Sequence, residues 1–168
     1  MERQYKAFIS YRHLPLDKET AIQVHRAIEH FVIPRSLRKD GQRKLGYVFR
    51  DEDELPVAGE LTENIRLALE NSEYLIVICT PETCKSAWVL KEVETFLQLR
   101  DRNHILLVLA DGEPAESFPR VITELRDESG RKIGEYEPMA ANLNAPSPAA
   151  RKRKFKVEIL RILAGLVP

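Results

Sequence analysis

Short apolar runs alternate along this chain with longer stretches in which apolar residues recur every three or four positions. The runs predict strands, and the most continuous of them predict burial on both faces. They lie at residues 5–11, 45–50, 74–79 and 105–109. The three-to-four spacing predicts amphipathic helices at 17–32, after 61, after 86 and at 155–166. This alternation predicts a parallel sheet between two helical layers, joined by right-handed crossovers.

The stretch 111–150 has the least regular pattern. Its eight glycines and prolines interrupt any period, and only a short helix at 120–125 and an edge strand near 139–143 are predicted. We expect residues 1–168 to form one domain, since the length suits one. The chain stops directly after an apolar helix, which suggests a domain taken from a longer multidomain protein.

Charge is balanced, because 26 Lys and Arg face 26 Asp and Glu. A neutral chain has no basic field to attract nucleic acid or an acidic membrane, and no apolar run approaches the roughly 20 residues of a membrane helix. The start lacks a signal-peptide core. The two cysteines, Cys79 and Cys84, fit neither a disulfide framework nor a thiolate metal site. We therefore expect a soluble cytoplasmic protein that binds neither nucleic acid nor membrane.

Several familiar chemistries lack their motifs. No Gly-x-Gly-x-x-Gly follows the first strand and no Gly-Lys-Ser/Thr loop is present, so the usual phosphate cradles are missing. The four histidines are scattered and the acidic stretch 51–54 lacks the order of a calcium loop, so we expect no metal and no cofactor. The basic run 151–156 allows contact with anions, but a solvated helix face is its simpler interpretation.

Two segments hold the candidate chemistry. Residues 7–13 read Ala-Phe-Ile-Ser-Tyr-Arg-His, a buried strand that runs directly into polar residues. Residues 86–92 read Ser-Ala-Trp-Val-Leu-Lys-Glu, the start of a helix that follows another apolar strand. Ligands of open α/β sheets bind just beyond the carboxyl ends of the strands. Both segments are therefore expected at one crevice.

Glu92 is the candidate functional residue of the second segment. The buried stripe of this helix contains Val89, Val93 and Phe96, together with Leu97. Glu92 falls on the shoulder of that stripe, and Trp88, one turn earlier, falls on the same flank. On the pattern alone the simpler interpretation is structural: the indole anchors the helix, and the carboxylate lies in its first turns, where the helix dipole favours it.

These segments and one loop resemble a Toll/interleukin-1 receptor (TIR) domain, most closely its bacterial members. The strand end Phe8-Ile9-Ser10-Tyr11-Arg12, the loop 50–59 and the Trp-x-x-x-Glu pattern at 88–92 occur in its order and spacing. The resemblance is close over residues 5–110 and loose beyond. It implies a flavodoxin-like fold, in which a five-stranded parallel sheet of order 2-1-3-4-5 is flanked by helices. Strand order then reverses between strands one and three, so their ends share one crevice.

TIR domains are either scaffolds that associate with other TIR domains or enzymes that cleave the nicotinamide glycosidic bond of NAD+. The enzymes carry a glutamate four residues after a tryptophan in the third helix. The resemblance therefore implies that Glu92 is catalytic and that NAD+ is a substrate rather than a cofactor. Because nicotinamide leaves as a neutral base, one carboxylate that stabilises the developing ribose cation is sufficient.

The resemblance also implies a substrate-binding set, which comprises Ser10, Tyr11, Arg12, Leu61, Ser86 and Trp88. Trp88 would wall the ribose site, while Tyr11 and Arg12 would hold the nicotinamide ribose and the pyrophosphate. Leu61 stands where some NAD-cleaving relatives have a stacking aromatic residue, which implies weaker binding or an adenine held by a neighbouring subunit. Alternatives stay open: Tyr11 packs beneath the crevice, Arg12 pairs with the acidic loop, and Ser86 caps the helix.

One loop resembles the segment that TIR domains use for self-association, and its marker residues are Asp51, Asp53, Leu55, Pro56 and Gly59. The expected partners are NAD+ and other TIR domains, in a homo-oligomer or filament. Because such enzymes often build their sites across these contacts, we expect low activity from a monomer. The resemblance further implies release of ADP-ribose or a cyclic isomer, and a role in bacterial antiviral defence.

Two other functions compete with this interpretation. The first is a non-catalytic TIR–TIR interaction module for signalling. The second is a phospho-receiver on the same fold, which requires an acidic pair after strand one and an aspartate after strand three. This chain has Ser10-Tyr11-Arg12 and Cys79-Thr80-Pro81 at those places, which argues against the receiver.

Overall fold

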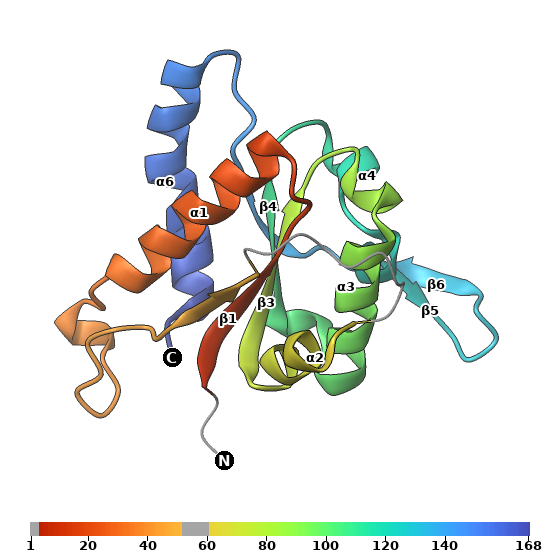
Figure 1. The fold of residues 1–168 in the computed structure, drawn as a ribbon, viewed down its shortest axis with the longest axis horizontal. Coiled ribbons are helices and arrows are strands. Elements are labelled where there is room, and N and C mark those ends of the chain that lie inside the picture. Colours follow the sequence, from red (N-terminus) through yellow and green to blue (C-terminus); the bar gives the residue numbers. More distant parts are fainter. Residues whose placement is uncertain (1–3, 52–60) are drawn as a thin grey trace.

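The computed structural model describes residues 4–51 and 61–168, which form a three-layer α/β fold (Figure 1). Its central sheet has the strand order β2-β1-β3-β4-β7, and every neighbouring pair is parallel. The strands are β1 (Tyr5–Ser10), β2 (Val48–Arg50), β3 (Ser72–Cys79), β4 (Ile105–Leu109) and β7 (Met139–Asn142). The flavodoxin-like sheet of order 2-1-3-4-5 is thus confirmed, with β7 as its fifth strand.

Helices cover both faces of this sheet. On one face lie α1 (Pro15–His30) and α6 (Pro148–Leu166), and on the other lie α2 (Glu63–Glu70) and α3 (Ala87–Leu99) (Figure 1). The connections hold the short helices α4 (Pro114–Ser117) and α5 (Arg120–Thr123) and the 3-10 turns η1 (Arg35–Leu37), η2 (Thr83–Lys85) and η3 (Arg102–His104).

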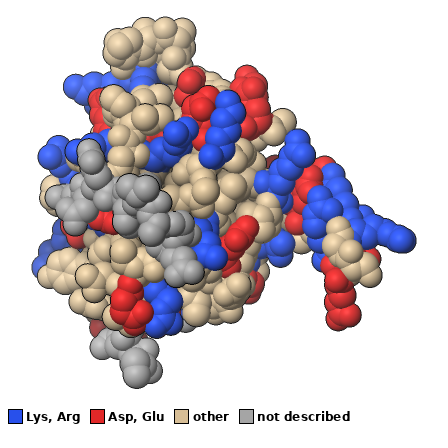
Figure 2. Space-filling view, turned by 45° about the vertical axis from the view of Figure 1, so that its right-hand side comes forward, with Lys and Arg blue, Asp and Glu red and all other residues tan. Residues whose placement is uncertain are grey.

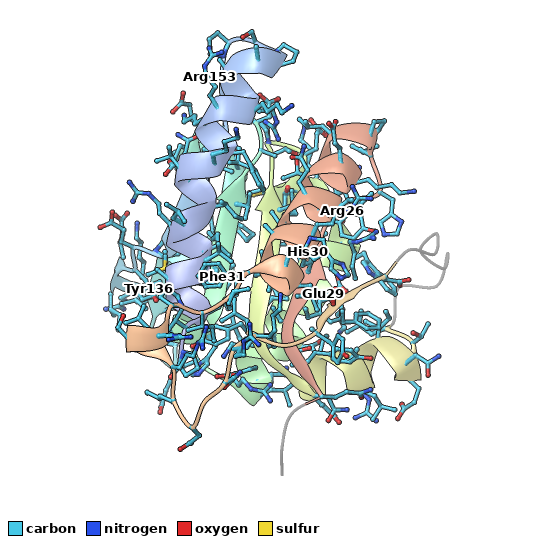
Figure 3. The ribbon with its side chains drawn as sticks, turned by 90° about the vertical axis from the view of Figure 1, so that its left-hand side faces the viewer. Arg26, Glu29, His30, Phe31, Tyr136 and Arg153 are labelled. Atoms are coloured by element: carbon cyan, nitrogen blue, oxygen red, sulfur yellow. The ribbon has the colours of Figure 1, made fainter. Side chains whose placement is uncertain are left out.

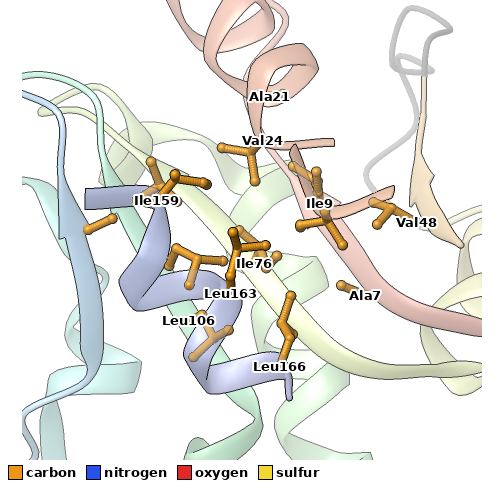
Figure 4. Close-up of a cluster of buried hydrophobic side chains, with 14 of the residues drawn as sticks. Ala7, Ile9, Ala21, Val24, Val48, Ile76, Leu106, Ile159, Leu163 and Leu166 are labelled. Atoms are coloured by element: carbon orange, nitrogen blue, oxygen red, sulfur yellow. The ribbon is translucent and has the colours of Figure 1, made fainter. Parts of the chain in front are cut away.

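Two apolar clusters fill the spaces between the layers. Successive strand residues point to opposite faces, so Ile9 of β1 packs beneath α1 and α6, while its neighbour Phe8 packs beneath α2 and α3. Figure 4 shows the first cluster, in which Ile76 and Leu106 of the sheet meet Leu163 of α6. The continuous apolar runs of β3 and β4 follow from this burial on both sides.

The stretch 111–150 departs most from the sequence expectation. The edge strand near 139–143 is confirmed as β7, and the short helix at 120–125 is α5, but α5 ends early and the chain turns into a hairpin. This hairpin pairs β5 (Glu124–Arg126) with β6 (Lys132–Glu135) and projects from the body, carrying side chains of both charges (Figures 1 and 2). Because most of its side chains face solvent, it leaves no hydrophobic period in the sequence.

The basic run 151–156 is only partly the solvated helix face that the sequence favoured. Arg151 is half-buried, and Lys154 donates a hydrogen bond to the Asn144 carbonyl oxygen at 2.7 Å. The side chains of Lys152, Arg153 and Lys156 are exposed. The structure therefore divides this run between anchoring cations and free ones. None of the described helices has the length and apolar character needed to cross a membrane.

Gly112, which follows β4, supports a prediction about stability. Its φ is +78°, and a Cβ there would lie 2.5 Å from Pro81 Cγ and 2.8 Å from Ser117 Oγ. Gly112→Ala combines left-handed backbone strain of about 1 kcal/mol with overpacking of about 2 kcal/mol. We expect the free energy of unfolding in urea to fall by about 3 kcal/mol.

Gly130→Ala is the matched control, because its φ is +82° but no atom lies within 4 Å of the added Cβ. It should lose only the backbone share, about 1 kcal/mol. Equal losses in the two variants would show that the contact between Gly112 and Pro81 is not close-packed.

Candidate functional site

The carboxyl ends of β1 and β3 form the switch point of the sheet, because strand order runs in opposite directions from there. β1 ends at Ser10, and β3 ends at Cys79, after which η2 leads into α3. Two neighbouring strands thus deliver the two segments singled out in the sequence to one edge. Open α/β sheets bind their ligands at this edge.

Glu92 joins the two segments. It lies on the second turn of α3, is 2% exposed, and accepts a hydrogen bond on Oε1 from Ser10 Oγ at 2.7 Å. Ser10 is itself 1% exposed. The helical pattern placed Glu92 on the shoulder of the buried stripe, and the structure buries it fully. α3 contacts α2 as well as β1 and β3, and Glu92 itself lies against Ser10 at the end of β1.

Burial controls the protonation of this carboxyl. It raises the pKa of Glu92 to about 8, because the charged form loses its hydration; the Ser10 hydrogen bond lowers the pKa, and the Asp51 charge raises it. At pH 7 the Glu92 carboxyl is therefore mostly protonated. A cationic ligand beside it would favour the ionised form, and in a site of low dielectric the resulting attraction is strong.

Tyr11 and Asp51 form the next part of the site. Tyr11 is 3% exposed and belongs to the core beneath α1, and its hydroxyl donates a hydrogen bond to the Asp51 carbonyl oxygen at the end of β2. Its ring stacks on His13, with centroids 4.6 Å apart. The structure thus gives Tyr11 the packing role that the sequence left open, and it ties the ends of β1 and β2 together.

Trp88, Leu61 and Ser86 surround the start of α3 and the approach to α2. Trp88 and Leu61 are half-buried and both pack against the apolar cluster that contains Phe8. Ser86 is the N-cap of α3, since its Oγ accepts a hydrogen bond from Val89 N at 3.3 Å. Of the two interpretations of Ser86, the structure supports the capping role.

Arg12 reaches across the edge of the sheet to the turn that follows β3. Its Nη1 donates to the Glu82 carbonyl oxygen at 3.1 Å and lies 3.5 Å from Glu82 Oε2. The sequence offered the acidic loop as a partner and did not single out Glu82. The signal was nonetheless present, because Glu82 is a polar residue just beyond the end of a buried strand.

Asp17 is a second buried carboxyl near this edge that the sequence analysis missed. It is 2% exposed, and its Oδ2 has no hydrogen-bond partner in the described structure. Burial raises its pKa to about 6, while the Arg12 charge lowers the pKa and the Asp111 charge raises it. A sequence signal existed, since Asp17 shares the spacing of the buried Ala21 and Val24 on α1. The pattern marks an acid on a buried stripe.

The predicted self-association loop is mostly outside the described residues. Asp53, Leu55, Pro56 and Gly59 fall in the segment 52–60, and only Asp51 is described, at the end of β2. Across residues 4–51 and 61–168, no three His, Cys, Asp or Glu side chains gather as a metal site would require.

The fold and this edge define a doubly wound α/β domain with its candidate site at the topological switch point. A family model described as "TIR domain" matches residues 7–134. The match covers more than half of the chain, so this chain belongs to the TIR domain family.

Two known proteins are similar to this chain. It is 34% identical over 110 residues to NAD(+) hydrolase ApTIR of Actinoplanes sp.. The aligned region covers 66% of this chain and 14% of that protein. The chain thus spans about one seventh of that relative's length. The TIR domains in the structure of the activated Roq1 resistosome directly recognizing the pathogen effector XopQ match with a TM-score of 0.50 and 19% identity, over 66% of this chain and 60% of that one. That likeness shows the fold alone.

The raised pKa of Glu92 predicts a pH dependence of stability. Between pH 4.5, the ordinary pKa of the group, and about 8, the folded chain keeps a proton that the unfolded chain has lost. The free energy of unfolding therefore decreases as the pH rises through this window. We expect Glu92→Gln to abolish the decrease between pH 6 and 8, as measured by urea unfolding at constant ionic strength.

Asp17→Asn provides the matched control, because the raised pKa of Asp17 acts only between 3.8 and about 6. It should flatten the profile below pH 6 and leave the higher window unchanged. Identical slopes for the wild type and Glu92→Gln above pH 6 would contradict a buried, protonated Glu92.

Proposed function

We propose that this chain is an NAD+ hydrolase that cleaves the bond between nicotinamide and ribose, with Glu92 as the catalytic residue. The observation that carries the proposal is the buried Glu92 carboxyl at the switch point, hydrogen-bonded to Ser10. The 34% identity to a protein named NAD(+) hydrolase supports it. Neither a metal nor a cofactor is needed for this reaction.

The chemistry suits a single carboxylate. Nicotinamide in NAD+ is a pyridinium, so when the bond between ribose C1′ and the ring nitrogen breaks, the electron pair stays on nitrogen and the base leaves neutral. Positive charge moves onto the ribose ring as an oxocarbenium-like transition state. Glu92, ionised, would stabilise that charge. Water then adds to C1′ and releases a proton, so the products are nicotinamide, ADP-ribose and one proton.

The raised pKa of Glu92 fits this role. In the unliganded protein the carboxyl is mostly neutral at pH 7, which spares the fold a buried charge. The pyridinium of bound NAD+ would favour loss of the proton, and the charge that moves onto the ribose would strengthen the attraction as the bond breaks. Substrate would thus generate the active form of the residue.

We assign roles in positioning and substrate binding to the other residues of the proposed site. Ser10 is a positioning residue, since its hydroxyl holds the Glu92 carboxyl. Trp88 would wall the ribose site, and Leu61 would cover the adenine or leave it to a neighbouring subunit. Arg12, whose side chain is 28% exposed, would hold the pyrophosphate by exchanging Glu82 for phosphate.

We further propose that the site is completed by self-association through the loop that begins at Asp51, with a cyclic ADP-ribose isomer as the alternative product to ADP-ribose and antiviral defence as the role. A non-catalytic TIR–TIR interaction module is the second candidate. The specific observation in its favour is that Glu92 is only 2% exposed in the single chain. Assembly would have to open the approach to this carboxyl if the chain is an enzyme.

Substitution of Glu92 tests the enzymatic proposal. We expect Glu92→Gln to lower the rate of nicotinamide release about 100-fold or more, because the charge that meets the transition state is lost. NAD+ is incubated with concentrated protein and the products are separated by chromatography.

Glu94→Gln is the matched control, since Glu94 is an exposed glutamate on the same helix. It should release nicotinamide within about twofold of the wild-type rate. Unchanged release by folded Glu92→Gln protein would overturn the assignment. Assembly without nicotinamide release at any protein concentration would favour the interaction module.

The Ser10 hydrogen bond predicts a shift of the pH–rate profile. In the wild type, kcat/KM for NAD+ should rise with pH to a plateau above about 8, as Glu92 ionises. Ser10→Ala removes the hydrogen bond that lowers the pKa of Glu92, so this rise should move to higher pH and the rate at pH 7 should fall more than the rate at pH 9.

Ser72→Ala is the control for a merely structural loss. Ser72 is fully buried and donates to the Ala68 carbonyl oxygen at 2.6 Å, at the opposite end of β3 from the site. Both variants should lose stability, but only Ser10→Ala should move the profile. An equal shift in both, or in neither, would remove Ser10 from the proposed mechanism.

A further inference from the structure

A groove of about 940 Å³ lies between α1 and α6, on the face of the sheet opposite to α3. Figure 3 looks onto this face and shows α1 and α6 side by side, with Arg26 and His30 labelled on α1 and Arg153 on α6. The groove walls come from the N-terminal half of α6, from one side of α1 and from the segment 145–147. Nothing in the proposed NAD+ site uses this groove.

Exposed positive charge lines the groove on both walls. Arg26 stands on its α1 wall and Lys152 and Lys156 on its α6 wall, and all three are exposed, with no ion pair or side-chain hydrogen bond to any described residue. Arg66 and Arg161, which are exposed cations outside the groove, lie beside carboxylates, whereas Arg153 forms no ion pair with a described residue. The whole chain is neutral, so this local excess is set by the fold.

Arg151 adds a fixed positive charge to the same groove. Its guanidinium donates to the Ala110 and Leu143 carbonyl oxygens at 2.7 and 3.1 Å and to Thr20 Oγ1 at 2.8 Å. All three acceptors are neutral, and the carboxylates of Glu19 and Asp111 act on its charge from nearby. The groove lining holds four cations and one carboxylate, Glu19, a net charge of +3, which Asp111 outside the lining reduces to +2.

The floor of the groove is apolar. Leu16 and Ala27 of α1 and Phe155 of α6 line it, and each is half-buried, so part of the aromatic ring remains accessible. An aromatic face favours stacking with a flat ring. Residues four apart on a helix lie about 6 Å apart along its axis, so Lys152 and Lys156 stand in line along the α6 wall.

We propose that this groove binds a nucleotide, with the base against Phe155 and the phosphates between the cations of α1 and α6. The groove combines cationic walls with an apolar floor. A nucleotide carries both complementary groups, since its phosphates are anionic and its base is a flat ring. Four cations are fewer than a nucleic acid needs for firm binding to its phosphates. A membrane surface cannot enter a groove between two helices.

The test is titration of the 168-residue chain with ADP, using adenosine and inorganic pyrophosphate as partial probes and calorimetry as the measurement. We expect ADP to bind more tightly than either probe. The double variant Lys152→Glu/Lys156→Glu should weaken ADP about tenfold or more, because four units of charge change at the groove. Arg153→Glu is the matched control: it is an exposed, unpaired cation of the same helix that does not line the groove, so it should change the affinity less than twofold.

Phe155→Leu separates the ring from the charge: it should weaken ADP and leave pyrophosphate unchanged. Full ADP affinity in the double charge variant would overturn the proposal, as would equal binding of ADP and pyrophosphate. Tighter binding of a tetraglutamate peptide than of ADP would also overturn it. ADP could also enter the proposed NAD+ site, where Arg12 would hold its pyrophosphate, and Arg12 does not line the groove. Repeating the titration in Arg12→Ala separates the two sites: unchanged ADP affinity assigns the binding to the groove, and a loss of affinity as large as in the double charge variant would overturn the proposal.

Discussion

The parallel sheet must be covered on both faces, and the rest of the molecule depends on that constraint. Strands such as β3, buried along most of its length, cannot face water on either side. Two helical layers therefore close the two cores, and polar residues at the strand ends remain as the places where function can reside. The candidate site at Ser10 and Glu92 lies where the strands end. The groove lies within a covering layer, between α1 and α6.

Glu92 shows how tightly that packing couples to chemistry. A carboxyl in an apolar interface is unfavourable as an anion, and the single hydroxyl of Ser10 only partly replaces the lost water. The neutral form is thus the ground state of the folded chain. A cationic ligand changes which form is favoured, so burial becomes a means of tying ionisation to occupancy rather than a defect of the core.

Both faces of the sheet bury a carboxyl, Glu92 of α3 on one and Asp17 of α1 on the other, but the two faces differ in their cations. On the α3 face an acid is buried and mostly neutral, next to a hydroxyl. On the α1 and α6 face, Arg151 is held by neutral oxygens, and exposed cations gather around an apolar floor. A net charge of zero conceals this separation. The average composition therefore excludes an extended basic surface but does not exclude a local anion site.

The spacing of apolar residues along the sequence was sufficient to predict the sheet and the helical layers of this protein. Strand and helix positions, the strand order implied by the TIR resemblance, and the meeting of Ser10 with the Trp88–Glu92 segment all agree with the structure. The charged hairpin of β5 and β6 was missed, because a projecting element buries too little to leave a period. The α4 helix was missed because four residues are too few to show one.

Other features depend on contacts between residues far apart in the chain, which a pattern along one helix cannot contain. The helical spacing placed Glu92 on the shoulder of the buried stripe, and the structure buries it against Ser10 at the end of β1. Arg12 pairs with Glu82, which lies beyond the neighbouring strand β3. The run 151–156 contains both anchored and exposed cations because α6 packs near the ends of β4 and β7. The sequence by itself determined which residues form each layer, since that follows from local period. Only the tertiary structure decided which charges are buried, paired or left free, because solvation depends on neighbours brought from elsewhere.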